Sequence, residues 1–431
     1  MSDNSSNLPY KKTVFANGAR VLMIPMVGVN SVATSVMVGV GSRYETPEIN
    51  GISHFLEHMV FKGTTKYPTT EDVNTIERAG GLQNAYTDID ITNYHNKVLG
   101  EDWELALDIN KELAIHPSLE QQYIDKERDV ILEEMKRYDD EPAAKVGETF
   151  HSMMYPNSRL GMRIIGEVES LKSSDAATLR AYHSAWYKPE KMVVVLAGKL
   201  DALDAVSAKT AEWFGNLKAE KTAEVEKVAN DSQDAPHVAV VTKPDAQQAH
   251  INVGLRTFAR GNEDRFAWGL FNLIMGVSFT SRLFKEVREK RGLCYHVRSS
   301  SDNWVDVGYW SIYAGVATAK VEEALKAILH EVSVAVDTGV TEEELTVAKK
   351  RLKTMLAFKS EDPEFMGEFY GRQEVFNEPL MTMDQYIEKL DSVNTAHING
   401  LIKKYCIQKN LNLAVVWNKP VDDTLSTLLV L

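Results

Sequence analysis

Cysteine is scarce in this chain of 431 residues, which contains only Cys294 and Cys406. Two thiols form neither a disulfide framework nor a thiolate zinc site, so any metal must be bound by histidine and carboxylate side chains. Long apolar runs are also missing, and none approaches the roughly 18 residues of a membrane-spanning helix. The polar segment from Met1 to Lys12 has no apolar signal core. We therefore expect no membrane association and a cytoplasmic location.

Positive charge is in deficit, because 48 lysine and arginine residues face 61 aspartate and glutamate residues, giving a net charge of −13. This balance argues against a nucleic acid partner and against binding to anionic membranes. The hydrophobic content of 44% and the charged content of 25% are ordinary for a globular protein. The length exceeds that at which a single core keeps growing, so we expect two or more domains.

One pentapeptide carries the clearest chemical signal: His54-Phe55-Leu56-Glu57-His58. On a helix, the two imidazoles and the carboxylate lie on one face. Two imidazoles can supply two of the three protein ligands of a catalytic zinc ion, and the carboxylate can serve as the base that activates water. The order is that of a zincin motif reversed. The pattern indicates a metallohydrolase, most simply a peptidase; the alternative is a partly buried helix with hydrogen-bonded histidines.

Elements of the chain recur at a nearly constant offset. Predicted strands at Arg20–Pro25 and His237–Thr242 start 217 apart (237 − 20), and closing strands at Met192–Ala197 and Leu411–Val416 start 219 apart (411 − 192). So long a period is typical of a duplicated domain. We predict a first domain at residues 1–217, a linker at 218–234 and a homologous second domain at 235–431.

The order of predicted elements favours an α+β fold built of α/β layers, in which helices pack on a mixed β-sheet in each domain. Further strands are predicted at Ser31–Val40, Ala85–His95 and Gln248–Leu255, and further helices at Leu119–Arg137, Arg265–Met275 and Thr341–Ser360. Asn50 is expected to cap the helix that carries the pentapeptide, and Gly63 to end it.

The duplication tests the pentapeptide within one sequence. The offset between the two halves (237 − 20 = 217) places Phe271, Ile274 and Met275 where the first half has its two histidines and its glutamate. An apolar helix face is therefore the ordinary occupant of this position, and polar groups are costly there unless they have partners. The histidines and glutamate are thus unlike plain core residues.

A third ligand is expected among the carboxylates of the predicted helix that contains Glu127, Glu133 and Glu134. Glu127 and Glu134 are seven residues apart and share a helix face, whereas Glu133 points in another direction. The same offset places Arg351 at the position of Glu134 (351 − 134 = 217). The second half therefore lacks the carboxylate and has a cation that is incompatible with a metal site.

These intervals resemble those of the pitrilysin family of inverzincins, which includes insulin-degrading enzyme and the mitochondrial processing peptidase. In that family the interval from the second histidine to the third ligand is the one found here (134 − 58 = 76), and another glutamate precedes the third ligand as Glu127 does (134 − 127 = 7). The resemblance implies one zinc ion per chain, bound by His54, His58 and Glu134. It implies that Glu57 is the catalytic base and that Glu127 is a supporting catalytic carboxylate, although a surface salt bridge is an alternative role for Glu127.

Two further patches resemble substrate-binding segments of the family. Asn84 and Ala85 match an edge strand to which a peptide adds as another strand, although Asn84 also suits an ordinary turn. Arg288 and Tyr295 match an Arg/Tyr pair seven residues apart (295 − 288). Arg288 would bind substrate oxygens, and Tyr295 would both bind substrate and stabilise the oxyanion as a catalytic residue. The alternative for this basic run is a solvated helix face.

The resemblance covers nearly the whole chain and implies a mitochondrial-processing-peptidase-like fold. Because the zinc set lies in the first half and the Arg/Tyr pair in the second, similarity to short bacterial-type members implies a homodimer that encloses its active sites in a chamber. The implied activity is that of a zinc metalloendopeptidase acting on short or unfolded peptides. The alternatives are a processing peptidase that removes leader sequences and a non-catalytic peptide-binding or structural subunit, against which the complete ligand set argues.

Overall fold

The computed structural model describes residues 8–228, 233–420 and 423–431, so part of the predicted linker at 218–234 lies outside the described residues. The chain divides into two compact units that do not follow its sequential halves. The first contains Met1–Glu133, Met162–Glu226 and Met355–Met383, and the second contains Glu134–Gly161, Lys227–Thr354 and Asp384–Leu431. Each half of the chain therefore contributes segments to both units.

The first unit is built on a mixed sheet that, within the described residues, has six strands in the order β1-β2-β6-β3-β5-β4. Its strands are β1 (Lys11–Val14), β2 (Arg20–Pro25), β3 (Ser31–Val38), β4 (Leu82–Thr87), β5 (Thr92–Leu99) and β6 (Met192–Gly198). Its helices are α1 (Ile52–Val60), α2 (Thr70–Val73), α3 (Thr75–Arg78), α4 (Trp103–Ile115), the first part of α5 (Gln121–Asp140), α7 (Val168–Ser173), α8 (Ala176–Trp186), α9 (Leu203–Thr210) and α13 (Pro363–Val375). β2 and β6 are parallel, and the other neighbours are antiparallel.

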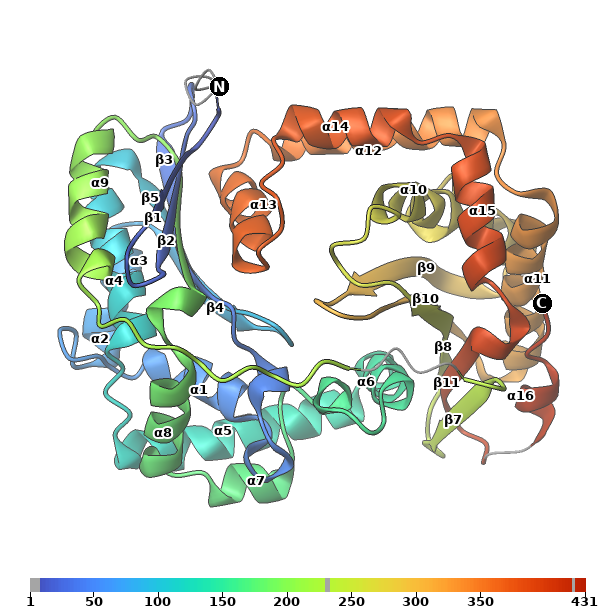
Figure 1. Ribbon diagram of the computed structural model, residues 1–431. Helices are drawn as coiled ribbons and strands as arrows, with labels where there is room; N and C mark the ends of the chain where they lie inside the picture. Colours follow the sequence, from blue (N-terminus) through green and yellow to red (C-terminus); the bar gives the residue numbers. More distant parts are fainter. Residues whose placement is uncertain (1–7, 229–232, 421–422) are drawn as a thin grey trace. The chain divides into compact units, whose positions relative to one another are not determined.

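The centre of this sheet is apolar on both faces, because every residue of β6, Met-Val-Val-Val-Leu-Ala-Gly, is buried. Such a continuous run is typical of a strand covered on both sides. Helix α13, from the C-terminal half, covers one face with Met366, Tyr370 and Val375. It approaches the strands closely at Gly371, where an added Cβ would lie 2.6 Å from the Met37 sulfur. Helix α4 packs against β3 and β5 from the opposite face (Figure 1).

The second unit repeats this design. Within the described residues its sheet has five strands in the order β7-β11-β8-β10-β9, with β7 and β11 parallel and the other neighbours antiparallel. The strands are β7 (His237–Thr242), β8 (Gln248–Thr257), β9 (Cys294–Asn303), β10 (Gly308–Ala317) and β11 (Leu411–Trp417). The helices are α6 (Pro142–Met154), α10 (Arg265–Gly276), α11 (Val321–Thr338), α12 (Glu342–Lys359, to Thr354 in this unit), α14 (Met383–Ser392, from Asp384), α15 (Thr395–Tyr405), α16 (Asp423–Thr427) and a π-helical segment, η8 (Phe284–Lys290).

Helix α6 comes from the N-terminal half but packs on β11 and β8 of the second sheet. Tyr155, directly after it, donates a hydrogen bond of 3.0 Å to the Gly308 carbonyl at the start of β10. The reverse also holds, since α13 comes from the C-terminal half of the chain but belongs to the first unit.

The predicted fold class is confirmed, because each unit is a mixed sheet packed with helices and the two strand orders correspond. Strands β2 and β7 have the bounds expected from the sequence. The strand expected at Ala85–His95 is wrong as a single element: it is the end of β4 and the start of β5. The chain turns between them, where the Asp88 N–H donates to the Ile91 carbonyl at 2.8 Å.

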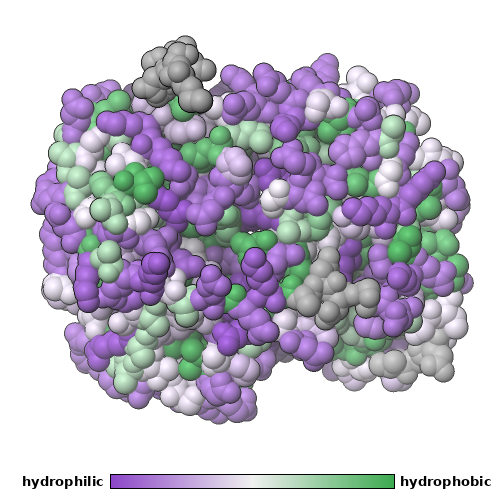
Figure 2. Space-filling view, in the orientation of Figure 1, coloured by the Kyte–Doolittle hydropathy of each residue, from purple (hydrophilic) through white to green (hydrophobic). Residues whose placement is uncertain are grey.

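Hydrophilic residues cover most of the visible surface, and hydrophobic residues form small scattered groups there (Figure 2). In the described parts of the chain, no helix is both long enough and apolar enough to cross a membrane.

Candidate metal centre

Helix α1, which carries the pentapeptide, begins in a tightly constrained turn. Gly51 has a left-handed φ of 92°, and a Cβ on it would lie 2.7 Å from the Gly166 Cα, so glycine is required. The buried Glu45 carboxylate accepts hydrogen bonds from the N–H groups of Gly51 and Ser53 at 2.7 and 2.8 Å. Burial raises the pKa of Glu45 to about 7, although these hydrogen bonds oppose the shift. The expectation that Asn50 caps the helix is wrong: its side chain donates to Glu45 instead.

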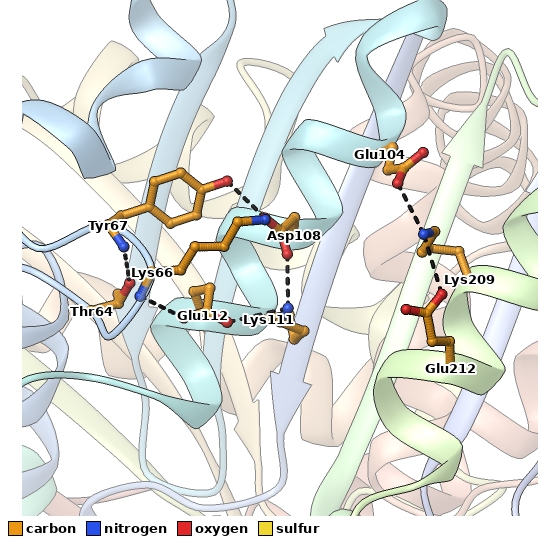
Figure 3. Close-up of polar contacts among 9 residues, drawn as sticks. All are labelled: Thr64, Lys66, Tyr67, Glu104, Asp108, Lys111, Glu112, Lys209 and Glu212. Atoms are coloured by element: carbon orange, nitrogen blue, oxygen red, sulfur yellow. Dashed lines mark hydrogen bonds and ion pairs between the residues drawn. The ribbon is translucent and has the colours of Figure 1, made fainter.

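The loop after α1 is bound to α4 by a polar network (Figure 3). Lys66 forms an ion pair with Asp108, and the Tyr67 hydroxyl donates to the same carboxylate at 2.7 Å. Lys111 contacts Asp108 at 2.8 Å and Glu112 at 3.2 Å. Asp108 and Glu112 are each 4% exposed, so their partners compensate for the loss of hydration. The network thus holds the loop after α1 against α4, whereas Glu45 binds the start of α1.

His54, His58 and Glu134 come together as a group that fits a metal ion. Each offers one ligand atom, and these atoms lie within 4.8 Å of one another. The two imidazole rings, one helical turn apart on α1, have centroids separated by 4.6 Å. Burial, with a contribution from His58, lowers the pKa of His54 to about 3, so this imidazole is neutral near pH 7. Neutral imidazole is the form that binds metals.

Helix α5 supplies the carboxylates. It is continuous from Gln121 to Asp140, so Glu134 is held two turns beyond Glu127 on one rigid element. Glu134 also accepts a hydrogen bond of 3.2 Å from Arg137, one turn further on. Glu133 is exposed, as its direction on the helix predicts.

Glu127 contacts α1 directly. Its Oε1 lies 2.9 Å from His58 Nδ1, and its Oε2 lies 2.6 Å from the Lys62 ammonium. Although burial favours the protonated carboxyl, the hydrogen bonds from His58 and Lys62 hold the pKa of Glu127 below its ordinary value. A carboxylate on Nδ1 orients the ring and leaves Nε2 for a metal. Lys62, in the turn directly after α1, was not recognised from the sequence.

Glu57 lies on α1 between the two histidines and is partly exposed. Its Oε2 accepts a hydrogen bond of 2.9 Å from the hydroxyl of Thr87, the last residue of β4. Thr87 was also missed, because no local sequence pattern links a helix residue to the end of a later strand. The contact restricts the orientation of the carboxylate beside the histidines.

Asn84 and Ala85 lie on β4, which is the outer strand of the sheet and pairs with β5 alone among the described strands. Asn84 is exposed, and its side-chain oxygen accepts a hydrogen bond of 2.9 Å from the Ala85 N–H. That N–H therefore faces away from β5, in the direction from which another strand would add.

Arg288 and Tyr295 lie in the second unit, on η8 and at the start of β9. The Arg288 guanidinium sits over the Tyr295 ring at 4.9 Å and over the Phe284 ring at 4.6 Å. Tyr295 is 81% exposed, so its hydroxyl is accessible. The two side chains thus contact each other, with Arg288 on a π-helical turn rather than on a regular helix and Tyr295 on a strand.

The structure has two related mixed-sheet units, and only one of the two duplicated helices, α1, contributes histidines to the His–His–Glu group. These features are those of a metallopeptidase. Family models agree: "Insulinase (Peptidase family M16)" matches residues 20–168, and "Peptidase M16 inactive domain" matches residues 174–352. The chain belongs to peptidase family M16, and the pitrilysin-type resemblance is confirmed. The model described as inactive covers the helix that has Phe271, Ile274 and Met275 in place of the pentapeptide's polar residues.

Relatives of similar length support this assignment. An uncharacterised zinc protease of Bacillus subtilis, YmxG, is 33% identical over 395 residues, which are 91% of this chain and 95% of the relative. An uncharacterised zinc protease of Mycobacterium tuberculosis is 30% identical over 417 residues, covering 96% of this chain and 94% of the relative.

Solved structures share the fold. A protease from Helicobacter pylori aligns with a TM-score of 0.90 at 22% identity, covering 95% of this chain and all of that one. The first half of the periplasmic protease PqqL of Escherichia coli aligns with a TM-score of 0.79 at 19% identity, covering 98% of this chain and 96% of that one.

Proposed function

We propose that this chain is a zinc-dependent endopeptidase that hydrolyses short or unfolded peptides. The observation that carries the proposal is the group of His54, His58 and Glu134, whose ligand atoms lie within 4.8 Å of one another. Two imidazole nitrogens and a carboxylate oxygen are a donor set of catalytic zinc, which keeps a fourth position open. These residues would hold one ion per chain.

The ion, when bound, lowers the pKa of water and polarises the scissile carbonyl group. Glu57 accepts the proton of the attacking water and passes it to the leaving amine, a role that needs a carboxylate beside the ligands. The Thr87 hydroxyl, 2.9 Å from Glu57, restricts that carboxylate to one orientation. Glu127 restricts the His58 ring in the same way, through Nδ1 at 2.9 Å.

The substrate binds as an additional strand along β4. Main-chain hydrogen bonds provide affinity with little demand on sequence, and the Ala85 N–H is the first such donor. Binding requires the Asn84 side chain to release that N–H, since it now accepts from it at 2.9 Å. Extended, unfolded segments fit this mode, whereas folded chains do not offer a free strand.

We infer that the active enzyme is a homodimer in the cytoplasm. The two histidines and Glu57 lie in the first unit and the Arg288–Tyr295 pair lies in the second, so two copies can complete each other's sites. Arg288 would bind substrate oxygens, and the exposed Tyr295 hydroxyl would donate to the oxyanion of the intermediate. A chamber enclosed by two copies would admit short or unfolded peptides.

Cleavage of a mixed peptide pool, followed by mass spectrometry with and without chelator and added zinc, tests the activity. Glu57→Gln should retain zinc and lose cleavage. Glu134→Gln should lose zinc itself, whereas Glu133→Gln, the same change one residue away on the exposed side of α5, should retain both. Full cleavage by the Glu57→Gln protein, or equal zinc content in the two α5 variants, would contradict the assigned roles.

The homodimer has a separate test by complementation. Glu57→Gln and Arg288→Ala proteins should each be inactive, but a mixture that exchanges subunits should recover about a quarter of wild-type activity. Half of the dimers are then mixed, and one of the two sites in each mixed dimer is complete. If each chain instead completes its own site, the mixture will stay inactive.

A further inference from the structure

The second unit contains a cavity of about 380 Å³ between α10 and α12. All of its lining residues belong to this unit. Leu273, Ile274, Val347 and Ala348 give it an apolar part, and hydroxyl groups of the segment after α10 add polar edges. Its volume is within the range of pockets that bind small organic ligands.

The lining carries an excess of positive charge, unlike the chain as a whole. Three cations, Arg282, Lys285 and Arg351, face two carboxylates, Glu343 and Glu344. One carboxylate is already bound, because Glu344 accepts two hydrogen bonds from Arg282, at 2.6 and 2.7 Å. Lys285 and Arg351 have no ion-pair partner among the described residues. The cavity therefore favours an anion over a cation.

Arg282 is held as a fixed donor. Besides Glu344, it binds the Gly339 carbonyl at 2.8 Å, and 13% of its side chain is exposed. Its remaining nitrogen, Nη1, is buried and has no hydrogen-bond partner among the described residues. A buried guanidinium nitrogen without a partner is unfavourable, so an acceptor from a ligand would stabilise it.

The duplication shows that the charge at one position of the cavity is opposite to that at the corresponding position of the first half. The offset between the halves places Glu344 at the position of Glu127 (344 − 127 = 217) and Arg351 at the position of Glu134 (351 − 134 = 217). The retained glutamate binds the His58 imidazole in the first unit and the Arg282 guanidinium in the second. Where the first half of the chain has a carboxylate that can bind a metal cation, the second half has a cation at the corresponding position.

We propose that this cavity binds the carboxylate of a peptide C-terminus, with the last side chain against Leu273, Ile274 and Val347. The choice of a peptide rests on the proposed function, because each cleavage creates a new C-terminal carboxylate. An apolar part beside the cations suits an apolar C-terminal residue, whereas inorganic phosphate would use the cations alone. The site lies within the second unit and would bind peptide ends independently of the metal centre.

Calorimetric titration of the full-length protein with N-acetyl-Ala-Leu and with its C-terminal amide tests the proposal. The blocked dipeptide is too short to be an endopeptidase substrate, and mass spectrometry can verify that it stays intact. The amide lacks the charge that strengthens hydrogen bonds to the cations of the cavity, so it should bind at least about tenfold more weakly than the free acid. Because the titration measures binding alone, it stays valid even if the protein shows no peptidase activity.

Two variants of α12 locate the binding site. Arg351→Gln should weaken the free acid about tenfold and reduce the difference between acid and amide, because the two changes remove interactions with the same carboxylate. Lys350→Gln, the same loss of charge on the neighbouring exposed residue, should bind like wild type. Equal affinity for acid and amide, or equal effects of the two variants, would overturn the proposal. Displacement of the dipeptide by inorganic phosphate at equal concentration would also overturn it.

Discussion

The contact between Glu127 and His58 leads to a quantitative prediction about metal affinity. Glu127 is 7% exposed, and its two oxygens are occupied by His58 Nδ1 at 2.9 Å and by Lys62 at 2.6 Å. Glu127→Gln keeps an acceptor for the imidazole but removes the charge that makes it a better donor to zinc. Glu127→Ala removes the acceptor as well and leaves the partly buried Lys62 ammonium without this counter-ion.

Loss of a carboxylate behind a metal-binding histidine typically weakens metal binding 10–100-fold. We expect roughly a tenfold loss for Glu127→Gln, where a neutral hydrogen bond replaces a charge-assisted one, and roughly a hundredfold loss for Glu127→Ala. Competition with a chromophoric zinc chelator measures both constants. Glu133→Gln, a surface change on the same helix, is the control and should keep wild-type affinity. The reasoning fails if Glu127→Ala binds zinc as tightly as this control.

Three further predictions concern other parts of the first unit. Thr87→Val should lower kcat about tenfold at unchanged zinc content, because Glu57 loses a hydrogen bond worth about 1.5–3 kcal/mol; unchanged steady-state rates would exclude this role. Glu45, whose pKa rises from 4.5 to about 7 on burial, binds its proton more tightly in the folded state. The stability that it contributes is present below pH 4.5 and is lost as the pH rises through 7, by about 3 kcal/mol in total. Urea unfolding across this range should show the decline for wild type and a flatter profile for Glu45→Gln. Tyr370→Ala should reduce the free energy of unfolding by about 3–5 kcal/mol, since this side chain is 1% exposed on α13; a loss below about 1 kcal/mol in urea would refute its place in the core.

The sequence predicted the parts of the molecule that repeat or follow a strong period. Strands β2 and β7 have their expected bounds because each is a short continuous apolar run, and the constant offset between the halves relates the two. The helix of the pentapeptide and the long helix of Glu134 follow from helical periodicity. Two glutamates spaced by seven residues also specify one helix face whatever the tertiary structure.

Other features depend on contacts that local sequence does not encode. Asn50 is a good capping residue in isolation, but the buried Glu45 carboxylate takes the helix N–H groups because the fold brings it there. The Thr87–Glu57 contact joins the end of a strand to a helix 30 residues away, and the Glu127–Lys62 ion pair joins α5 to the turn after α1. Such pairings become visible only when the sheet and its helices are assembled.

The exchange of α6 and α13 has a consequence for biosynthesis. The first sheet cannot complete its core until Met366, Tyr370 and Val375 have left the ribosome, when nearly the whole chain has been translated. Until then, a nascent chain of the first half exposes apolar sheet surface, which makes it prone to aggregation. Cutting the chain between its halves would thus separate each sheet from a helix that covers it, and co-expression of the two fragments should be needed for either to fold.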